Sequence, residues 1–228
     1  MITALYSDQF IAENAPMDRR LAALILSRGN RIGYIASGPE PQREFFNEKR
    51  RYYRSYGLSL DLFFDLDVLS GDEEIGRLFS YDAIHLSGGH TGDFLRRLRQ
   101  SGMLDKLRSW ALDDGILVGT SAGAILMTPT IAVDALFSGG SPDAVQDGAA
   151  LDLLPFEFFP HLNDDPGYLS ALLRYSETTA TPILACRDGE GLILGNGLVE
   201  IFGAPLMISD GFAEASDGGR IADLLSRA

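Results

Sequence analysis

A chain of 228 residues with 46% hydrophobic and 22% charged residues has the size and composition of a single globular domain. Its formal net charge of −13 repels phosphate backbones and anionic headgroups, which excludes nucleic acids and membrane surfaces as expected partners. The single cysteine cannot form an internal disulfide, and no apolar run reaches the roughly 18 residues of a membrane-spanning helix. Residues 1–8 have no basic segment typical of a secretory signal, so we expect a cytoplasmic protein.

The first 120 residues alternate short apolar runs with longer amphipathic segments. The apolar runs predict buried strands at residues 2–7, 31–36, 58–66, 83–86 and 116–118. The segments between them predict helices at residues 17–28, 41–56, 72–79, 91–99 and 102–112. This alternation is typical of βαβ units, so the sequence predicts an α/β fold in which a mostly parallel sheet has helices on both faces.

The second half of the chain is less regular. Residues 192–201 predict a hairpin, because Asn196-Gly197 lies between two apolar runs. Helices are predicted at 165–176 and 221–228, and residues 138–148 predict a loop. Because the sequence has no repeat, linker or low-complexity tract, we predict one domain over residues 1–228. Ligands of open parallel sheets bind at the carboxyl ends of the strands, which directs attention to the loops after Ser7, Ala36, Leu86 and Val118.

The segment Gly119-Thr120-Ser121-Ala122-Gly123 lies between a predicted buried strand and a run of helix-forming residues. A strand, Gly-x-Ser-x-Gly and a helix form the context of a nucleophile elbow, in which the glycines let the backbone approach closely. The pattern predicts Ser121 as a nucleophile and the N–H of Ala122 as an oxyanion-hole donor. The alternative is a tight structural turn with no chemistry.

A serine nucleophile needs a general base, and the chain has three histidines. His85 lies within a predicted strand, where a buried core residue is expected. His90 follows the same strand on a loop and is the second choice. His161 follows Pro160 at the junction of an apolar and a polar segment, a position that suits a fixed base. We therefore predict His161 as the base.

The third member of a triad is left open by the residues alone. A Ser-acid-His order in the chain would use Asp134, Asp143, Asp147, Asp152 or Glu157, and a Ser-His-acid order would use Asp164, Asp165, Asp188 or Glu190. Cys186 lies in an apolar run and is expected to be a buried, inert thiol. The elbow carries serine where a class-I glutamine amidotransferase would carry cysteine.

Three segments together resemble a known family. Leu86-Ser87-Gly88-Gly89-His90-Thr91, the elbow through Ala124, and Pro160-His161 are similar to the peptidase E and cyanophycinase family of serine peptidases. The likeness runs from the first strand through Gly203. It implies a three-layer α/β fold of the class-I glutamine-amidotransferase type, which is flavodoxin-like.

The resemblance also implies residue roles. Ser121 matches the nucleophile of the family and His161 matches its base. The N–H of Gly89 would join that of Ala122 in the oxyanion hole. Asp188 matches the acid best, with Glu190 as the alternative and Asp134 as the next residue to consider.

Two positions depart from the family pattern. The family has Gly-Gly-Asn-Thr where this chain has His90 in place of the asparagine; Gly88, His90 and Thr91 are the residues of this loop expected to contact the substrate. The acid of the family is often glutamate, and Asp188 is shorter by one methylene. It therefore needs a closer backbone to reach the histidine.

The predicted function is hydrolysis of peptide or isopeptide bonds through a Ser-His-acid triad. The family includes an aspartyl dipeptidase branch and a branch that degrades an aspartate–arginine polymer, and no residue here selects either. The alternatives are a catalytically silent binding protein and an esterase or acyltransferase. No cofactor or metal is predicted, because the histidines and the cysteine have no ligand spacing. The expected partner is a peptide or other small acyl substrate, and the oligomeric state is open between monomer and homodimer.

Overall fold

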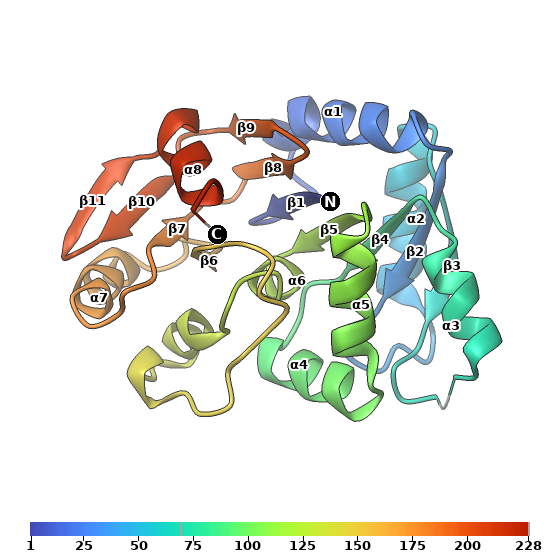
Figure 1. Ribbon diagram of the computed structural model, residues 1–228, viewed down its shortest axis with the longest axis horizontal. Helices are drawn as coiled ribbons and strands as arrows, with labels where there is room; N and C mark the ends of the chain where they lie inside the picture. Colours follow the sequence, from blue (N-terminus) through green and yellow to red (C-terminus); the bar gives the residue numbers. More distant parts are fainter. Residues whose placement is uncertain (69, 228) are drawn as a thin grey trace.

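The computed structural model describes residues 1–68 and 70–227. Leu69 and the predicted end of the last helix at Ala228 lie outside the described residues. A seven-stranded sheet has the order β3-β2-β4-β5-β1-β8-β9 (Figure 1). Its strands are β1 (Ile2–Tyr6), β2 (Arg31–Ile35), β3 (Ser59–Phe64), β4 (Ala83–Leu86), β5 (Ile116–Thr120), β8 (Gly191–Gly195) and β9 (Leu198–Phe202).

The first five strands of this sheet run parallel, as the alternation of strands and helices predicts. The β8–β9 pair adds two antiparallel strands at one edge and forms the predicted hairpin. Its turn has positive φ at Asn196 (51°) and Gly197 (79°), the conformation for which this dipeptide is suited. The mostly parallel α/β fold predicted from the sequence is therefore confirmed.

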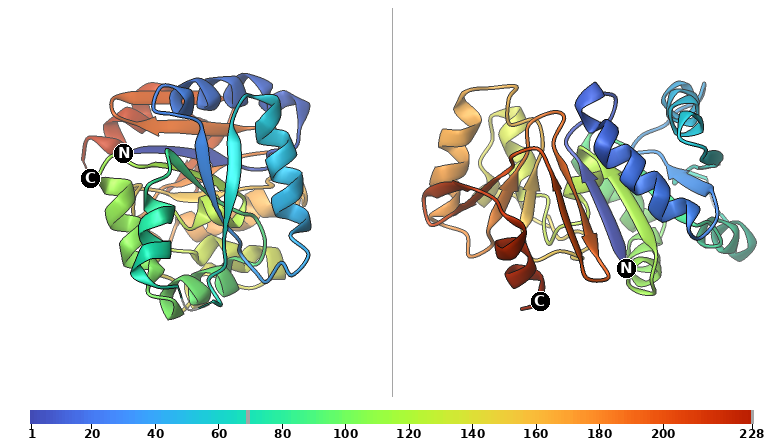
Figure 2. Two further views of the ribbon diagram at one scale, coloured as in Figure 1. Left: turned by 90° about the vertical axis from the view of Figure 1, so that its right-hand side faces the viewer. Right: turned by 90° about the horizontal axis from the view of Figure 1, so that it is seen from above.

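Helices cover both faces of the sheet (Figure 1 and Figure 2). Successive side chains of β1 point to opposite faces of the sheet. Ala4 and Tyr6 belong to the hydrophobic cluster that includes residues of α1 and α2, and Leu5 belongs to the cluster that includes residues of α4 and α5. The helices are α1 (Ala15–Leu26), α2 (Glu44–Ser55), α3 (Asp72–Phe79), α4 (Thr91–Gln100), α5 (Met103–Leu112) and the short α6 (Ala122–Ile125).

A second sheet, of the order β11-β10-β7-β6, was not predicted. Its strands are β6 (Glu157–Phe159), β7 (Ile183–Ala185), β10 (Leu206–Ser209) and β11 (Phe212–Ala215). The helix α7 (Gly167–Ser176) packs against β10 and β11, and α8 (Gly218–Leu225) packs against β9 of the first sheet. Strands of three or four residues are too short to show a period in the sequence. Buried side chains from both sheets, such as Leu5 and Leu184, belong to one hydrophobic cluster, so the sheets share a core.

Three short 3₁₀ helices occupy Ala12–Asn14, Ala132–Ser138 and Pro142–Ala144. The last interrupts the loop predicted at 138–148, because proline presets the backbone of a first helical position. Across residues 1–68 and 70–227, no helix combines the length and the apolar character that crossing a bilayer requires.

Candidate active site

Ser121 lies at a sharp turn between β5 and α6. Its φ of 53° and ψ of −114° are unusual for a residue with a side chain, and its N–H donates to the carbonyl of Tyr6 at 2.9 Å. The flanking glycines permit the turn. A Cβ built at Gly119 would lie 2.5 Å from the backbone of Gly123, and one at Gly123 would collide with the carbonyl of Leu86. The strand–turn–helix context predicted for the elbow is thus present.

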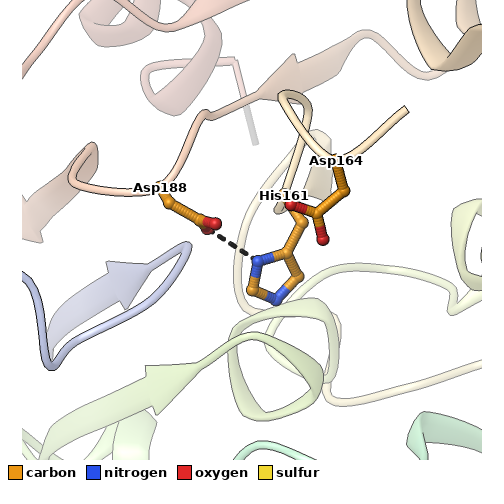
Figure 3. Close-up of side chains that lie close together, drawn as sticks. All are labelled: His161, Asp164 and Asp188. Atoms are coloured by element: carbon orange, nitrogen blue, oxygen red, sulfur yellow. Dashed lines mark hydrogen bonds and ion pairs between the residues drawn. The ribbon is translucent and has the colours of Figure 1, made fainter. Parts of the chain in front are cut away.

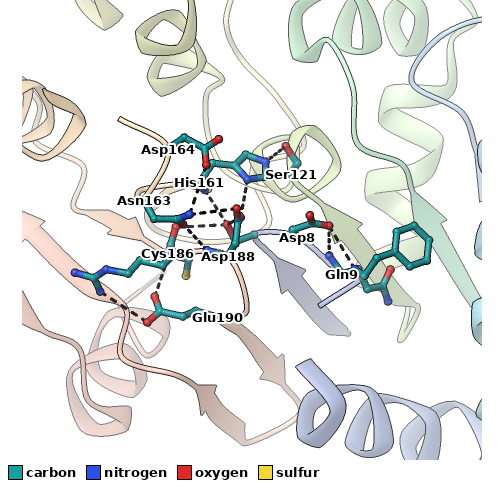
Figure 4. A network of polar contacts seen from close by, with 12 residues as sticks. Asp8, Gln9, Ser121, His161, Asn163, Asp164, Cys186, Asp188 and Glu190 are labelled. Atoms are coloured by element: carbon teal, nitrogen blue, oxygen red, sulfur yellow. Dashed lines mark hydrogen bonds and ion pairs between the residues drawn. The ribbon is translucent and has the colours of Figure 1, made fainter. Parts of the chain in front are cut away.

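Ser121, His161 and Asp188 form one hydrogen-bonded chain (Figure 4). The Nε2 atom of His161 lies 2.8 Å from Oγ of Ser121, and its Nδ1 atom lies 2.7 Å from Oδ1 of Asp188. The side chains of His161 and Asp188 are 23% and 22% exposed, so solvent reaches them only in part. A carboxylate only accepts hydrogen bonds, so Nδ1 must carry the proton and Nε2 is free to accept one from the serine.

Two residues that the sequence analysis did not assign hold Asp188 in place. The hydroxyl of Ser7, directly after β1, donates to Oδ1 of Asp188 at 2.9 Å and accepts the backbone N–H of His161 at 2.7 Å. Asn163 accepts the N–H of Asp188 at 2.7 Å and donates to its Oδ2 at 3.4 Å. The position of Ser7 at the carboxyl end of a strand was the signal for it; Asn163 had none beyond its place two residues after His161.

His161 leaves the second sheet directly after β6 and Pro160. It has a φ of 54°, a rare value for histidine, which turns the side chain back toward the elbow. The chain beyond it is tied to the end of β7, because the N–H of Leu162 donates to the carbonyl of Cys186 at 3.0 Å. Cys186 itself is fully buried, and burial raises the pKa of its thiol well above the usual value. The histidine and the acid are therefore presented by two adjacent strands of the second sheet.

The two predicted oxyanion-hole donors lie on the residue after Ser121 and on the loop after β4, where a Cβ built at Gly88 would lie 3.6 Å from Cβ of Ser121. Ala122 begins α6, and Gly89 follows β4 with a φ of 139°, a value that disfavours residues with a side chain. A Cβ at Gly89 would also collide with the hydroxyl of Ser37. Neither N–H has a hydrogen-bond partner within the described part of the chain. The loop is fixed instead through Gly88, whose carbonyl accepts the Ser37 hydroxyl at 2.6 Å.

The other two histidines have side-chain partners other than Ser121. His85 is fully buried in β4, where Nδ1 lies 2.9 Å from the hydroxyl of Tyr53, and burial lowers its pKa well below the usual value. The side chain of His90 is 75% exposed and accepts the N–H of Asp93 at 3.1 Å, capping α4. Each histidine thus has a structural role as core residue or helix cap.

The alternative acids are also engaged elsewhere. Glu190 accepts the N–H groups of Arg187 at 2.8 Å and Ala204 at 3.0 Å, which closes a turn. Asp134 accepts the hydroxyl of Thr91, and burial raises its pKa. That bond also turns the Thr91 side chain, which is 1% exposed, toward Asp134.

His161, Asp164 and Asp188 bring three possible metal-ligand atoms within 4.8 Å of one another (Figure 3). His161 and Asp164 are three residues apart, but Asp188 follows 24 residues after Asp164, so no ligand motif in the sequence indicated this cluster. Both imidazole nitrogens are already engaged, one by Ser121 and one by Asp188. A cation ligated by either nitrogen would have to displace one of these partners, and the hydrogen bonds as they stand suit proton transfer from Ser121 to His161.

Glu157 supports the strand that leads to His161. Its carboxyl group is fully buried in β6 and accepts the hydroxyl of Tyr175 at 2.8 Å. Burial raises the pKa of Glu157 from 4.5 to about 7. The folded protein therefore keeps a proton here that the unfolded chain releases as the pH rises from about 4.5.

Because the folded protein holds a proton on Glu157, we expect its stability to fall as the pH rises. Because the folded-state pKa lies above the unfolded one, the free energy of unfolding falls between about pH 4.5 and pH 7, by an amount on the order of 3 kcal/mol from this group. Glu157→Gln has no proton to lose. We expect urea unfolding at pH 5 and pH 8 to show a smaller loss in Glu157→Gln than in the unmodified protein. An equal loss of unfolding free energy in the two proteins would contradict a raised pKa of Glu157 as the cause.

Comparisons with known proteins agree with this fold. The sequence model of peptidase family S51 matches residues 7–202. The uncharacterized peptidase Lmo0363 of Listeria monocytogenes is 29% identical over 147 residues, which are 61% of this chain and 69% of that protein. The uncharacterized peptidase Lin0382 of Listeria innocua is 34% identical over 106 residues, which are 45% of this chain and 50% of that protein.

Two crystal structures share the fold. A Listeria monocytogenes EGD-e protein provisionally assigned as peptidase E is 19% identical with a TM-score of 0.60, over 88% of this chain and 96% of that one. A peptidase from an acI-B1 Actinobacterium is 15% identical with a TM-score of 0.68, over 96% and 94%. At these sequence identities the two crystal structures support the fold alone, and the family assignment rests on the match over residues 7–202. The chain belongs to peptidase family S51.

Proposed function

We propose that this S51 peptidase is a serine peptidase in which Ser121 attacks the carbonyl carbon of a peptide bond. The observation that carries the proposal is the chain of hydrogen bonds from Ser121 through His161 to Asp188, at 2.8 and 2.7 Å. These distances lie within the range expected of a nucleophile, its base and the group that orients the base.

The proposed reaction has two halves. As Ser121 Oγ bonds to the carbonyl carbon, its proton passes to Nε2 of His161, and the N–H groups of Gly89 and Ala122 stabilise the oxyanion. His161 then gives this proton to the leaving amine as the carbon–nitrogen bond breaks. In the second half, His161 removes a proton from the water that attacks the acyl carbon, and it gives this proton to Oγ of Ser121 as the carbon–oxygen bond of the acyl-enzyme breaks and the acid product leaves. Asp188 holds the imidazole in the reactive tautomer and stabilises its charged form.

A digest of a peptide library with mass-spectrometric readout tests this function, with Ser121→Ala protein as the matched control and a panel of esters in parallel. We expect peptide bonds to be cut by the unmodified protein and left intact by Ser121→Ala. Cleavage of esters with no cleavage of peptides would favour an esterase or acyltransferase that uses the same side chains. No Ser121-dependent cleavage of either class would indicate a catalytically silent protein.

The acid can be tested against its neighbour in sequence. Asp188→Asn should lower kcat by up to about 10⁴-fold, because an amide at this position favours the wrong histidine tautomer. Glu190→Gln should leave kcat nearly unchanged, since Glu190 contacts the backbone of Arg187 and Ala204 and not His161. Steady-state kinetics of the two purified variants would decide between them. A crippled Glu190→Gln beside an active Asp188→Asn would show that the acid has been misassigned.

A further inference from the structure

A cavity of about 330 Å³ lies next to Ser121. Gly88, Gly89 and Thr120 form part of its wall, and they are the proposed oxyanion loop and the residue before the nucleophile. The volume falls within the range of small-ligand pockets, about 300–1,000 Å³. If the carbonyl group of a substrate lies at Ser121, a neighbouring side chain of the substrate can therefore bind in this cavity.

Aromatic rings form another part of the wall. Phe10 and Phe45 are 46% and 66% exposed, unusual fractions for phenylalanine, and both face this one cavity together with the buried Tyr34. The ring of Phe10 is fixed by an edge contact with Tyr52, at 5.0 Å between centroids, and by the Lys49 ammonium 4.1 Å from its centroid. Open aromatic surface around a concave site is the usual lining for an apolar ligand group.

The charged groups of the cavity do not favour an acidic ligand group. Asp8, Glu40 and Lys49 give it a net charge of −1, from two acids and one lysine. Glu40 is held by the hydroxyl of Tyr34 at 2.8 Å. Lys49 is 6% exposed, its ammonium already donates to Oε1 of Gln9 at 2.7 Å, and burial lowers its pKa to about 8. A carboxylate would thus meet an acidic pocket whose single cation is already engaged.

The position of the histidine assigns this cavity to one side of the scissile bond. His161 must reach the leaving amine to protonate it, so the leaving group lies beside His161. Neither His161 nor Asp188 lines the cavity within the described residues. In Figure 4, Asp8 and Gln9 lie to the right of Asp188, while Asn163 lies to its left. The cavity is therefore placed to receive the acyl part of the substrate.

We propose, on the basis of the proposed serine peptidase function, that this cavity binds an apolar or aromatic side chain on the acyl side of the scissile bond. The preferred substrates are then short peptides in which a residue such as phenylalanine or leucine precedes the bond that is cut. Peptides with aspartate at that position are poor substrates.

Two series of compounds that differ only on the acyl side test this specificity. The dipeptides Phe-Ala, Leu-Ala, Ala-Ala and Asp-Ala report on peptide cleavage. The p-nitrophenyl esters of 3-phenylpropanoic, acetic and succinic acid report on acylation of Ser121 alone. Every compound is also run with Ser121→Ala, so that only turnover that depends on the serine is counted.

We expect kcat/KM to be on the order of 10- to 100-fold higher for phenylalanyl and phenylpropanoyl compounds than for alanyl and acetyl ones. Phe45→Ala should lower that ratio about tenfold, because it removes one aromatic wall without opening the core. Phe212→Ala is the matched control, since Phe212 is 73% exposed on β11 and does not line the cavity; it should keep the ratio.

The outcomes separate this inference from the function on which it rests. If the aspartyl and succinyl compounds are turned over as fast as, or faster than, the phenylalanyl and phenylpropanoyl compounds in a Ser121-dependent way, the apolar specificity is wrong. The proposed serine peptidase function is still supported in that case. A ratio that Phe45→Ala leaves unchanged would also overturn the apolar specificity. If no compound of either series is turned over in a Ser121-dependent way, both the proposed serine peptidase function and the apolar specificity are contradicted.

Discussion

Ser121→Ala is expected to lower kcat on the order of 10⁴-fold or more while leaving the fold intact. The substitution removes the oxygen that would form the acyl-enzyme, so the two-step route is lost. The side chain lies at a half-buried turn and packs no core, so the free energy of unfolding should change by no more than about 0.5 kcal/mol. Steady-state kinetics on the best peptide found in the library digest would measure the first effect, and urea unfolding the second.

The contrast between the two measurements is what makes this variant informative. A variant that is equally stable and inactive supports a chemical role for the hydroxyl. Retained turnover in a protein of unchanged stability would contradict Ser121 as the nucleophile. Backbone N–H groups of Gly89 and Ala122 stay in place in this variant, so a small residual rate above that in water is expected.

His161→Ala is expected to be nearly as damaging, because the members of a triad act as a unit and the loss of one removes most of the effect of the others. The matched control is His90→Asn. That side chain is exposed and caps α4, and asparagine is itself a good N-cap, so turnover should be retained. Kinetics of the two purified variants at one pH provide the measurement. An active His161→Ala together with an inactive His90→Asn would reverse the assignment of the base.

Much of the parallel sheet and the elbow could be predicted from the sequence, because each rests on local patterns. The strand before Ser121 is a continuous apolar run, and Asn196-Gly197 marks the β8–β9 turn by its backbone preference alone. The second sheet could not be predicted. Its three- and four-residue strands are defined by hydrogen bonds between segments such as β6 and β7, which are more than 20 residues apart.

The choice between Asp188 and Glu190 shows a similar limit. In a continuing strand both would face the same side, so the sequence alone left both open. The structure ends β7 at Ala185, and Gly189, with a φ of 86°, belongs to a turn that directs Glu190 to the backbone of Ala204. The catalytic role of Asp188 stays a prediction, but the reason it rather than Glu190 reaches the histidine is this local change of direction.

Contacts between segments distant in the chain could not be predicted as pairs: the end of the first strand marked Ser7 as a position to inspect, but nothing in the sequence indicated its partners. Ser7 contacts Asp188 and His161 across more than 150 residues, and a serine after a strand has many possible uses. Phe10 and Phe45 likewise meet at one cavity only because the loop after β1 and the start of α2 converge there. Such residues are found from the fold and not from motifs.

Reaction with a fluorophosphonate, followed by intact-mass measurement and peptide mapping, tests the central claim most directly, because the probe requires an activated serine and no knowledge of the substrate. We expect one adduct per chain, mapped to Ser121, with labelling absent in Ser121→Ala and strongly slowed in His161→Ala. The absence of an adduct on the folded protein, or an adduct at another residue, would contradict a serine peptidase built on Ser121, His161 and Asp188.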